Sequence, residues 1–369
     1  MNLVIIRQNL SKVLSIVSRN ISSRPQLPIL SNILLEAKNN TLIISATNLE
    51  SGVTCLINAK TKQEGIITVP GKLFTEYIST LTSDKLEMEL LNTKLVIKTD
   101  KNKASFSTAS ATDFPSFSSF SKSEKNLPFN KIKQSILRVV FAASTDETRP
   151  VLTGVKVIIS GKKMKLIATD GYRMSTEEIG LPTTLEDFQA ILPAQTLIEL
   201  VRIATETKEE EVGFSIIQKK NQIVFTLTNI NLYSRLIEGE FPNVEKIIPQ
   251  GFKTKITVQK DDLIQSVKTA ALFARGAANI VKIKTEEKGL WLSANTPQIG
   301  ENQDFVEAKI EGENVETAYN YRFLLDILNN FPGDEVVIET SGPLNPGVFR
   351  SVSINQSFLH LIMPVRVQD

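Results

Sequence analysis

Apolar residues recur along this chain with two different periods, which predict strands and helices in a repeating order. Three stretches place apolar residues at every second position and then run into a polar turn, as expected for strands with one buried face. They are TLIISATN (41–48), KMKLIATD (163–170) and GLWLSANT (289–296). Ala46, Ala168 and Ala294 near their ends lie 122 and 126 positions apart. That spacing is close to one third of the 369 residues and predicts an internal triplication.

Two helical patterns accompany each of these strands. Apolar residues at three- and four-residue spacing predict a first helix in each third, over 7–20, 130–144 and 259–275. A second helix is predicted after Pro70, Pro193 and Asn320, which are 123 and 127 positions apart. An acid stands six positions past each of these landmarks, as Glu76, Glu199 and Asp326.

The order of these elements predicts three α+β domains near 1–125, 126–250 and 251–369. Each domain is expected to place two helices on one face of antiparallel sheet. The serine-rich stretch SFSSFSKSEKN (116–126) is typical of a surface linker between the first two domains.

Composition narrows the class of protein. Apolar residues make up 41% and charged residues 22% of the chain, which is typical of a soluble globular protein. No stretch approaches the roughly 18 apolar residues that cross a bilayer, and the first residues lack a cleavage-type signal pattern. One cysteine, Cys55, excludes an internal disulfide and fits a reducing cytosol. We therefore expect a cytoplasmic protein without membrane contact.

Candidate catalytic chemistry is sparse. Zinc sites and Ser-His or Cys-His catalysis usually use histidine, and His360 is the only one. No GxxxxGK[ST] loop and no GxGxxG turn is present. We expect no catalytic residue, no cofactor and no metal.

Basic residues concentrate in the predicted first helices. The net charge is +3 over 7–20, +3 over 130–144 and +1 over 260–275, whereas the whole chain carries only +2. The remainder of the chain must therefore be acidic. Cationic helices at the same place in three repeats indicate that a polyanion binds along one surface. Contact with the phosphates of duplex DNA, independent of its base sequence, fits this pattern best. The candidate contacts in these helices are Lys12, Arg19, Lys131, Lys133 and Arg138. Those on the second helices are Lys72, Gln195 and Arg202.

Several motifs resemble one known family from end to end. They are RPQLPILSNILLEA (24–37), ATNLE (46–50), TVPGKLF (68–74), RPVLTGV (149–155), ATDGYRM (168–174), FPNVEKIIP (241–249) and MPVRV (363–367). In order and spacing the chain closely resembles the bacterial DNA polymerase III beta subunits, the β sliding clamps. These are processivity factors in DNA replication.

The resemblance implies a head-to-tail homodimer of three-domain subunits. Such a dimer is a six-domain ring with its helices inside, and it encircles duplex DNA. The resemblance further implies that the polymerase catalytic subunit, the clamp loader, and repair and other polymerases bind through short linear motifs.

The resemblance also places a pocket for those motifs on the second domain, completed by the C-terminal segment. Its residues would be Arg149, Leu152, Thr169, Gly171, Tyr172, Arg173, Met174, Pro242, Ile247, Leu361, Met363, Pro364, Val365 and Arg366. Methionine and branched aliphatic residues would form adaptable walls, and Arg149 and Arg173 could donate to a bound peptide. Tyr172 departs from the histidine frequent at this place in relatives. Asp170 is expected to be only a turn residue, because Asp-Gly between strands is a strong hairpin signal.

Two more sites follow from the resemblance. Arg24 matches a loop arginine that touches duplex DNA. Phe106 matches an apolar residue of the dimer interface, where it would face Leu272 and Phe273 of the other subunit. Thr108 stands where the family pattern leads us to expect leucine.

Two alternatives remain open at this point. The chain could be an enzyme with a site near Asp170 or Glu50, which requires a deep cleft with coupled acids. It could also be a repeat scaffold that binds only proteins, with the basic helices uninvolved.

Overall fold

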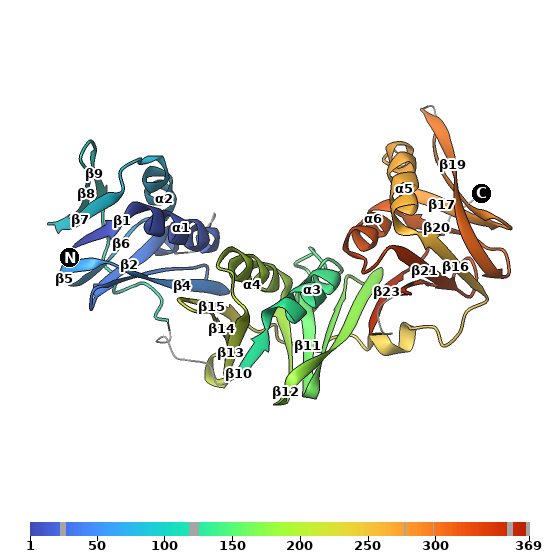
Figure 1. Ribbon diagram of the computed structural model, residues 1–369, viewed down its shortest axis with the longest axis horizontal. Helices are drawn as coiled ribbons and strands as arrows, with labels where there is room; N and C mark the ends of the chain where they lie inside the picture. The colour runs from blue at the N-terminus through green and yellow to red at the C-terminus, as the bar shows by residue number, and fades with distance from the viewer. Residues whose placement is uncertain (23–26, 118–124, 277, 298, 353–356, 367–369) are drawn as a thin grey trace. The chain divides into compact units, whose positions relative to one another are not determined.

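The computed structural model describes residues 1–22, 27–117, 125–276, 278–297, 299–352 and 357–366 (Figure 1). It divides into two compact units. The first unit is Met1–Phe129 with Glu199–Leu236, and the second unit is Asn130–Ile198 with Ile237–Asp369. The middle third of the chain therefore contributes to both units.

The predicted pairs of helices are present in each third. The first helices are α1 (Arg7–Val17), α3 (Phe129–Val140) and α5 (Lys260–Ala274). The second helices are α2 (Gly71–Thr80), α4 (Ala194–Glu206) and α6 (Tyr321–Asn330). Their apolar stripes face inward because burial at three- and four-residue spacing removes one helix face from water. In α1 that stripe is Leu10, Val13, Leu14 and Val17.

Two antiparallel sheets form the described part of the first unit. One has the order β5-β1-β7-β8-β9, with bounds Lys60–Gln63, Asn2–Ile6, Lys85–Leu91, Lys94–Lys98 and Lys103–Ser107. The other has the order β10-β13-β14-β15-β4-β3-β2-β6. Its bounds are Lys125–Pro128, Glu211–Ile217, Gln222–Thr226, Ile230–Arg235, Ser51–Asn58, Thr41–Thr47, Asn32–Lys38 and Gly65–Pro70. Helices α1 and α2 contact each other and pack on these strands (Figure 1).

One long antiparallel sheet runs through the described second unit, in the order β11-β12-β23-β22-β21-β16-β19-β18-β17-β20. Its bounds are Gly154–Thr169, Arg173–Pro193, Phe358–Ile362, Gly347–Ser351, Glu335–Thr340, Thr254–Gln259, Gly300–Gly312, Gly289–Thr296, Ile280–Glu286 and Glu316–Asn320. Helices α5 and α6 pack against each other, and α5 covers β16 to β19. Their shared core holds fully buried residues such as Leu263, Leu324 and Ile338.

The same strand ladder occurs three times, which confirms the triplication at the level of register. Each ladder begins four positions before the first residue of a first helix and crosses three more strands through directly opposed residues. The three series are Leu3–Met88–Ile97–Ala104, Lys125–Phe214–Phe225–Leu232 and Ile256–Ile338–Phe349–His360. Ala104, Leu232 and His360 are therefore equivalent positions.

Strand pairing also joins neighbouring thirds of the chain. Leu232 in β15 lies opposite Val53 in β4, so the eight-stranded sheet continues from the middle third into the first. His360 in β23 lies opposite Ser175 in β12, so the ten-stranded sheet continues from the last third into the middle one. Each of these junctions is one antiparallel ladder of main-chain hydrogen bonds.

His360 occupies the centre of the second of these ladders. Its ring is fully buried, with centroids 5.3 Å from Phe141 and 6.2 Å from Phe349. Neither ring nitrogen has a hydrogen-bond partner among the described residues. Burial, helped by the charge of Arg173, lowers the pKa of His360 well below its ordinary value. The imidazole is therefore neutral in the folded protein.

This burial predicts a specific acid sensitivity of the second unit. As the pH falls below about 6.5, the unfolded chain takes up a proton at this site while the folded chain does not. Stability should therefore be lost, by up to about 1.4 kcal/mol for each pH unit. His360→Leu should remove that part of the loss. Urea unfolding at pH 5 to 8 measures the difference between the two proteins, and parallel pH profiles would contradict the prediction.

Candidate functional site

The cationic side chains expected to contact DNA lie in contrasting surroundings. Lys12 on α1, Lys72 on α2 and Lys131 on α3 are exposed, and Gln195 on α4 is exposed as well. Lys12 faces solvent because the apolar stripe of α1 occupies the opposite side of the helix. Lys133 is half-buried. Arg24 lies outside the described residues.

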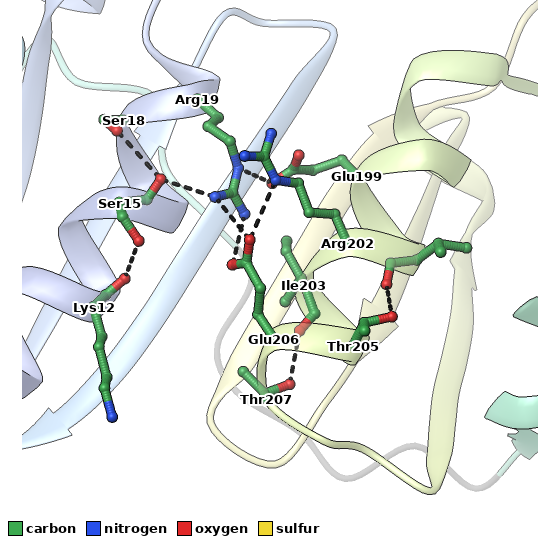
Figure 2. A network of polar contacts seen from close by, with 11 residues as sticks. Lys12, Ser15, Ser18, Arg19, Glu199, Arg202, Ile203, Thr205, Glu206 and Thr207 are labelled. Atoms are coloured by element: carbon green, nitrogen blue, oxygen red, sulfur yellow. Dashed lines mark hydrogen bonds and ion pairs between the residues drawn. The ribbon is translucent and has the colours of Figure 1, made fainter.

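Arg19 is held by carboxylates (Figure 2). Its Nε lies 2.8 Å from Glu199 Oε1, and its Nη2 lies 3.2 Å from Glu206 Oε2. Arg202 shares the second of these acids, with its Nε 3.2 Å from Glu206 Oε1. Burial raises the pKa of Glu199, and the hydrogen bond and charge of Arg19 oppose that rise. Two of the predicted phosphate contacts thus sit beside negative charge, which weakens their attraction for a polyanion.

Arg138 on α3 is also paired. Its Nη1 donates at 2.8 Å to Oε1 of Glu177, a carboxylate only 3% exposed. Arg138 therefore serves the packing of α3 against β12, and the role predicted for it in DNA contact stays a prediction.

The turn between β11 and β12 shows what Asp170 does. Its Oδ1 accepts from the main-chain N–H groups of Tyr172 at 2.9 Å and Arg173 at 3.0 Å. Asn48 accepts the same two bonds in the first third, from Glu50 and Ser51. The prediction of a turn residue is confirmed, and the enzyme alternative loses its leading acid.

Thr169 and Gly171 complete this turn. Thr169 is buried, with Oγ1 donating to the carbonyl of Arg173 at 2.6 Å and accepting from Gly171 N–H at 3.1 Å. Gly171 has φ +93°, a conformation that costs glycine little. Nη1 of Arg149 lies 4.0 Å from where a Cβ at Gly171 would stand, so the open space here borders an exposed arginine.

Arg173 points into the protein. It is 9% exposed, its Nε lies 2.9 Å from Asp170 Oδ2, and its Nη1 lies 2.6 Å from Asp326 Oδ2. Its Nη2 donates to the carbonyl of Phe141, and its guanidinium stacks on the ring of Phe323 at 4.4 Å. These groups engage three of the five N–H donors of Arg173 and hold its side chain inside the protein, behind the turn. The donation to a bound peptide that the resemblance implies for Arg173 stays a prediction.

The apolar residues of the expected pocket form a buried layer and an exposed layer. Met174 and Leu361 lie opposite each other in the β12–β23 ladder and are fully buried, while Leu152 is 8% exposed. Tyr172, Ile247 and Met363 are 66%, 46% and 38% exposed. Met363 N–H donates to the carbonyl of Tyr172 at 2.8 Å, which places these two residues side by side.

The remaining members of that set flank these layers. Pro242 and Arg366 are exposed, whereas Pro364 and Val365 are half-buried. Val365 N–H donates to the carbonyl of Ala318 in β20 at 2.8 Å, which anchors the C-terminal segment. We name Tyr172, Ile247 and Met363 the apolar patch.

The residues expected at the dimer interface are partly covered by their own chain. Phe106 is 6% exposed and packs edge-on against Phe74 and Tyr77, at centroid distances of 5.4 and 5.5 Å. Thr108 Oγ1 donates to the carbonyl of Thr93. Leu272 on α5 is 64% exposed, and Phe273 beside it is half-buried.

Some features of these surfaces were missed by sequence reasoning. Ile299, 74% exposed, and Leu73, 59% exposed, are apolar side chains in water near the predicted interface residues. Glu199 and Asp326 pair with Arg19 and Arg173. The sequence showed these two acids only as a residue type repeated six positions past Pro193 and Asn320, without indicating their partners.

The described residues contain neither a metal-binding cluster nor a membrane-spanning helix. In the part of the chain that the structure describes, no three His, Cys, Asp or Glu side chains are grouped to hold a metal ion. No helix within the same residues is long and apolar enough to span a membrane.

Comparison with known proteins places these features in a family. The three domain models of the DNA polymerase III beta subunit match the chain in order. The N-terminal domain matches residues 1–118, the central domain 126–243 and the C-terminal domain 245–366. A beta sliding clamp from Synechocystis sp. is 30% identical over 396 aligned residues and all of both chains. One from Staphylococcus epidermidis is 29% identical over 94% of each chain.

Solved structures agree with the family models. The DNA polymerase sliding clamp of Bacillus subtilis superposes with a TM-score of 0.93 at 26% identity, over the whole of both chains. The sliding clamp of Pseudomonas aeruginosa bound to griselimycin gives a TM-score of 0.91 at 25% identity, again over both whole chains. The matched models together span nearly the entire sequence. This chain belongs to the DNA polymerase III beta subunit family, the family of the beta sliding clamps.

Proposed function

We propose that this protein is a non-catalytic DNA sliding clamp, which closes around duplex DNA as a homodimer and tethers a polymerase to it. The observation that carries the proposal is the full-length correspondence to clamp structures. The internal junctions, each a strand ladder between adjacent thirds, support it. We assign the three domains to 1–125, 126–250 and 251–369, near the matched models.

Strand edges support the closing of a dimer. In the described residues β9 ends its sheet, and Gly300–Glu307 of β19 pairs on one side only, with β18. Unpaired edges are templates for pairing with another chain. Two copies arranged head to tail would pair β9 of one with β19 of the other at both contacts, which gives a closed assembly of six domains.

The internal ladders predict the register of that pairing. Ala104 is equivalent to Leu232 and His360, as established above. Asn302 is equivalent to Val53 and Ser175, because each faces the alanine of the preceding repeat strand. Since Leu232 faces Val53 and His360 faces Ser175, Ala104 should face Asn302 of the second copy.

A cross-linking experiment tests this register. In the Ala104→Cys/Asn302→Cys protein, a short bis-maleimide should join two chains efficiently, because directly opposed Cβ atoms are about 4.5–5.5 Å apart. The native Cys55 should not react, since burial raises its pKa to about 12. The readout is denaturing electrophoresis.

The matched control is Ser105→Cys with Asn302→Cys, a slip of one residue that turns the two thiols to opposite faces of the sheet. Equal cross-linking of both pairs would refute the register. A native mass equal to one 40.9 kDa chain at every concentration would refute the dimer.

Electrostatics support contact with the DNA backbone. Lys12, Lys72 and Lys131 project from helices into solvent, and we propose them, with Lys133, Gln195 and Arg24, as contacts of the channel lining. Phosphate contacts by lysine do not depend on base sequence and weaken with salt. A closed ring can therefore slide along a duplex without leaving it sideways.

Retention on DNA distinguishes a ring from an ordinary DNA-binding protein. After loading by a clamp loader, the protein should stay on a nicked circle and leave the same DNA once it is linearised. Gel filtration of labelled protein with DNA measures both. The protein-only scaffold predicts no retention on either form, and equal loss from both topologies would contradict encirclement.

We propose that the apolar patch and the side chains around it bind short peptide motifs of polymerases and other partners. Tyr172, Ile247 and Met363 are exposed, Tyr172 and Met363 are hydrogen-bonded neighbours, and Met174 and Leu361 share a buried apolar cluster in the adjoining strands. Arg149 and Arg366 are the exposed cations of the expected set and could fix the orientation of a peptide. Leu152, Thr169, Gly171, Pro242, Pro364 and Val365 would complete the site.

Removing the patch should weaken peptide binding without unfolding the protein. For Tyr172→Ala/Met363→Ala we expect a loss of about tenfold or more in affinity for a fluorescent peptide that carries a polymerase linear motif, because each exposed side chain loses its burial against the peptide. Fluorescence anisotropy gives the dissociation constant.

Leu91→Ala provides the control, since Leu91 is 46% exposed but lies in β7 of the first unit. An unchanged affinity of the double variant, with the control also unchanged, would rule out the patch.

A further inference from the structure

The repeated acid of the second helices has a defined role at both junctions inside the chain. Glu199 on α4 and Asp326 on α6 are equivalent, six positions past Pro193 and Asn320. Each receives an arginine from the preceding third of the chain. The ion pairs are Arg19 to Glu199 at 2.8 Å and Arg173 to Asp326 at 2.6 Å.

The first of these pairs is well enclosed. The side chains of Arg19 and Glu199 are 18% and 16% exposed, and Arg19 Nη1 also donates to the carbonyl of Ser15 at 3.1 Å (Figure 2). Arg19 stands two residues beyond the end of α1, so the helix and its short η1 continuation (Ser18–Asn20) aim it at α4. The contact joins residues 180 positions apart in the sequence.

The second pair uses the equivalent acid, Asp326, but its arginine comes from a different position of the repeat. Arg173 opens β12 and corresponds to Ser51 of the first third, because both follow the equivalent turn. The residue that corresponds to Arg19 is Phe141, and its carbonyl accepts from the Arg173 guanidinium at 2.8 Å. The acid is thus the common element, and the arginine is supplied from either of two neighbouring positions.

The third acid, Glu76 on α2, has no such partner among the residues that the structure describes. It is exposed, and its carboxylate makes no hydrogen bond or ion pair within the residues that the structure describes. The two positions that would supply an arginine lie in the last third of the chain. They are Leu272, equivalent to Arg19, and Gly300, equivalent to Arg173, and neither carries a charge.

We propose that Glu76 is a receptor carboxylate whose cognate arginine is missing at the junction between two copies of this chain. This inference rests on the proposed dimer. Each of the two junctions within the chain contains an ion pair between a buried or half-buried arginine and the repeated acid. The junction between copies relies on strand pairing and on apolar contacts of Leu272 and its neighbours.

The proposal predicts that a single substitution can supply the arginine that Glu76 lacks and so form the third ion pair. Leu272→Arg introduces the residue type found at Arg19, at a helix position that is 64% exposed in the single chain. Leu272→Gln is the matched control, because it removes the same apolar contact without adding charge. Relative to that control, the arginine variant should dimerise at least roughly tenfold more tightly, because the closed dimer gains one charged hydrogen bond at each of its two contacts.

A double-mutant cycle assigns the effect to Glu76. The dimer dissociation constants of both Leu272 variants are measured by sedimentation, with and without Glu76→Ala. In the arginine background Glu76→Ala should abolish the gain, and in the wild-type background it should change the constant less than twofold.

Two results would overturn the proposal. One is no gain of the arginine variant over Leu272→Gln, with the dimer otherwise intact. The other is a severalfold loss on Glu76→Ala in the wild-type protein, which would mean that another cation, such as Lys268, already fills the role. A wild-type protein that never dimerises would instead refute the proposed function itself.

Discussion

Main-chain pairing between strands of successive repeats is the constraint on which the rest of this structure depends. A strand at the edge of a sheet leaves N–H and C=O groups unsatisfied, and each repeat resolves this by joining its sheet to that of its neighbour. β4 pairs with β15 and β12 pairs with β23 in equivalent registers. Because a shift of one residue would turn every side chain to the wrong face, these ladders position the repeats as well as connecting them.

Side-chain chemistry at the junctions follows from this pairing. The β12–β23 ladder places His360 between aromatic rings and brings Arg173 to Asp326. The same ladder sets Met174 opposite Leu361, with Tyr172 and Met363 adjacent at its end. Two members of the apolar patch, Tyr172 and Met363, thus lie directly beside the ends of the two strands whose pairing joins the middle and last thirds of the chain.

The basic residues of this protein fall into two groups: exposed lysines, and arginines that are paired with carboxylates. Exposed lysines such as Lys12 and Lys131 remain available to a polyanion, whereas Arg19, Arg138 and Arg173 are directed at carboxylates. Arginine suits the second task, since its planar fork forms several directed hydrogen bonds at once and is more weakly hydrated than an ammonium group. Burying such pairs costs desolvation, so they specify geometry more than they add stability.

Much of the fold could be predicted from the sequence. The six helices, the three repeat strands and the Asp170 turn follow from local periodicity and turn chemistry, and the structure confirms them. The triplication was visible because equivalent residues recur at a nearly constant spacing. The site was less predictable. The inward turn of Arg173 and the covering of Phe106 by Phe74 and Tyr77 depend on contacts that no local pattern records.

The sequence by itself determined which segments are helical or extended, how often they repeat and where cations are abundant. Those properties depend on the burial of near neighbours along the chain. Only the tertiary structure decided which cations face water and which strand edges stay open. Arg19 meets an acid 180 positions away and Arg173 one 153 positions away, and such partners are chosen by the sheet register rather than by local spacing.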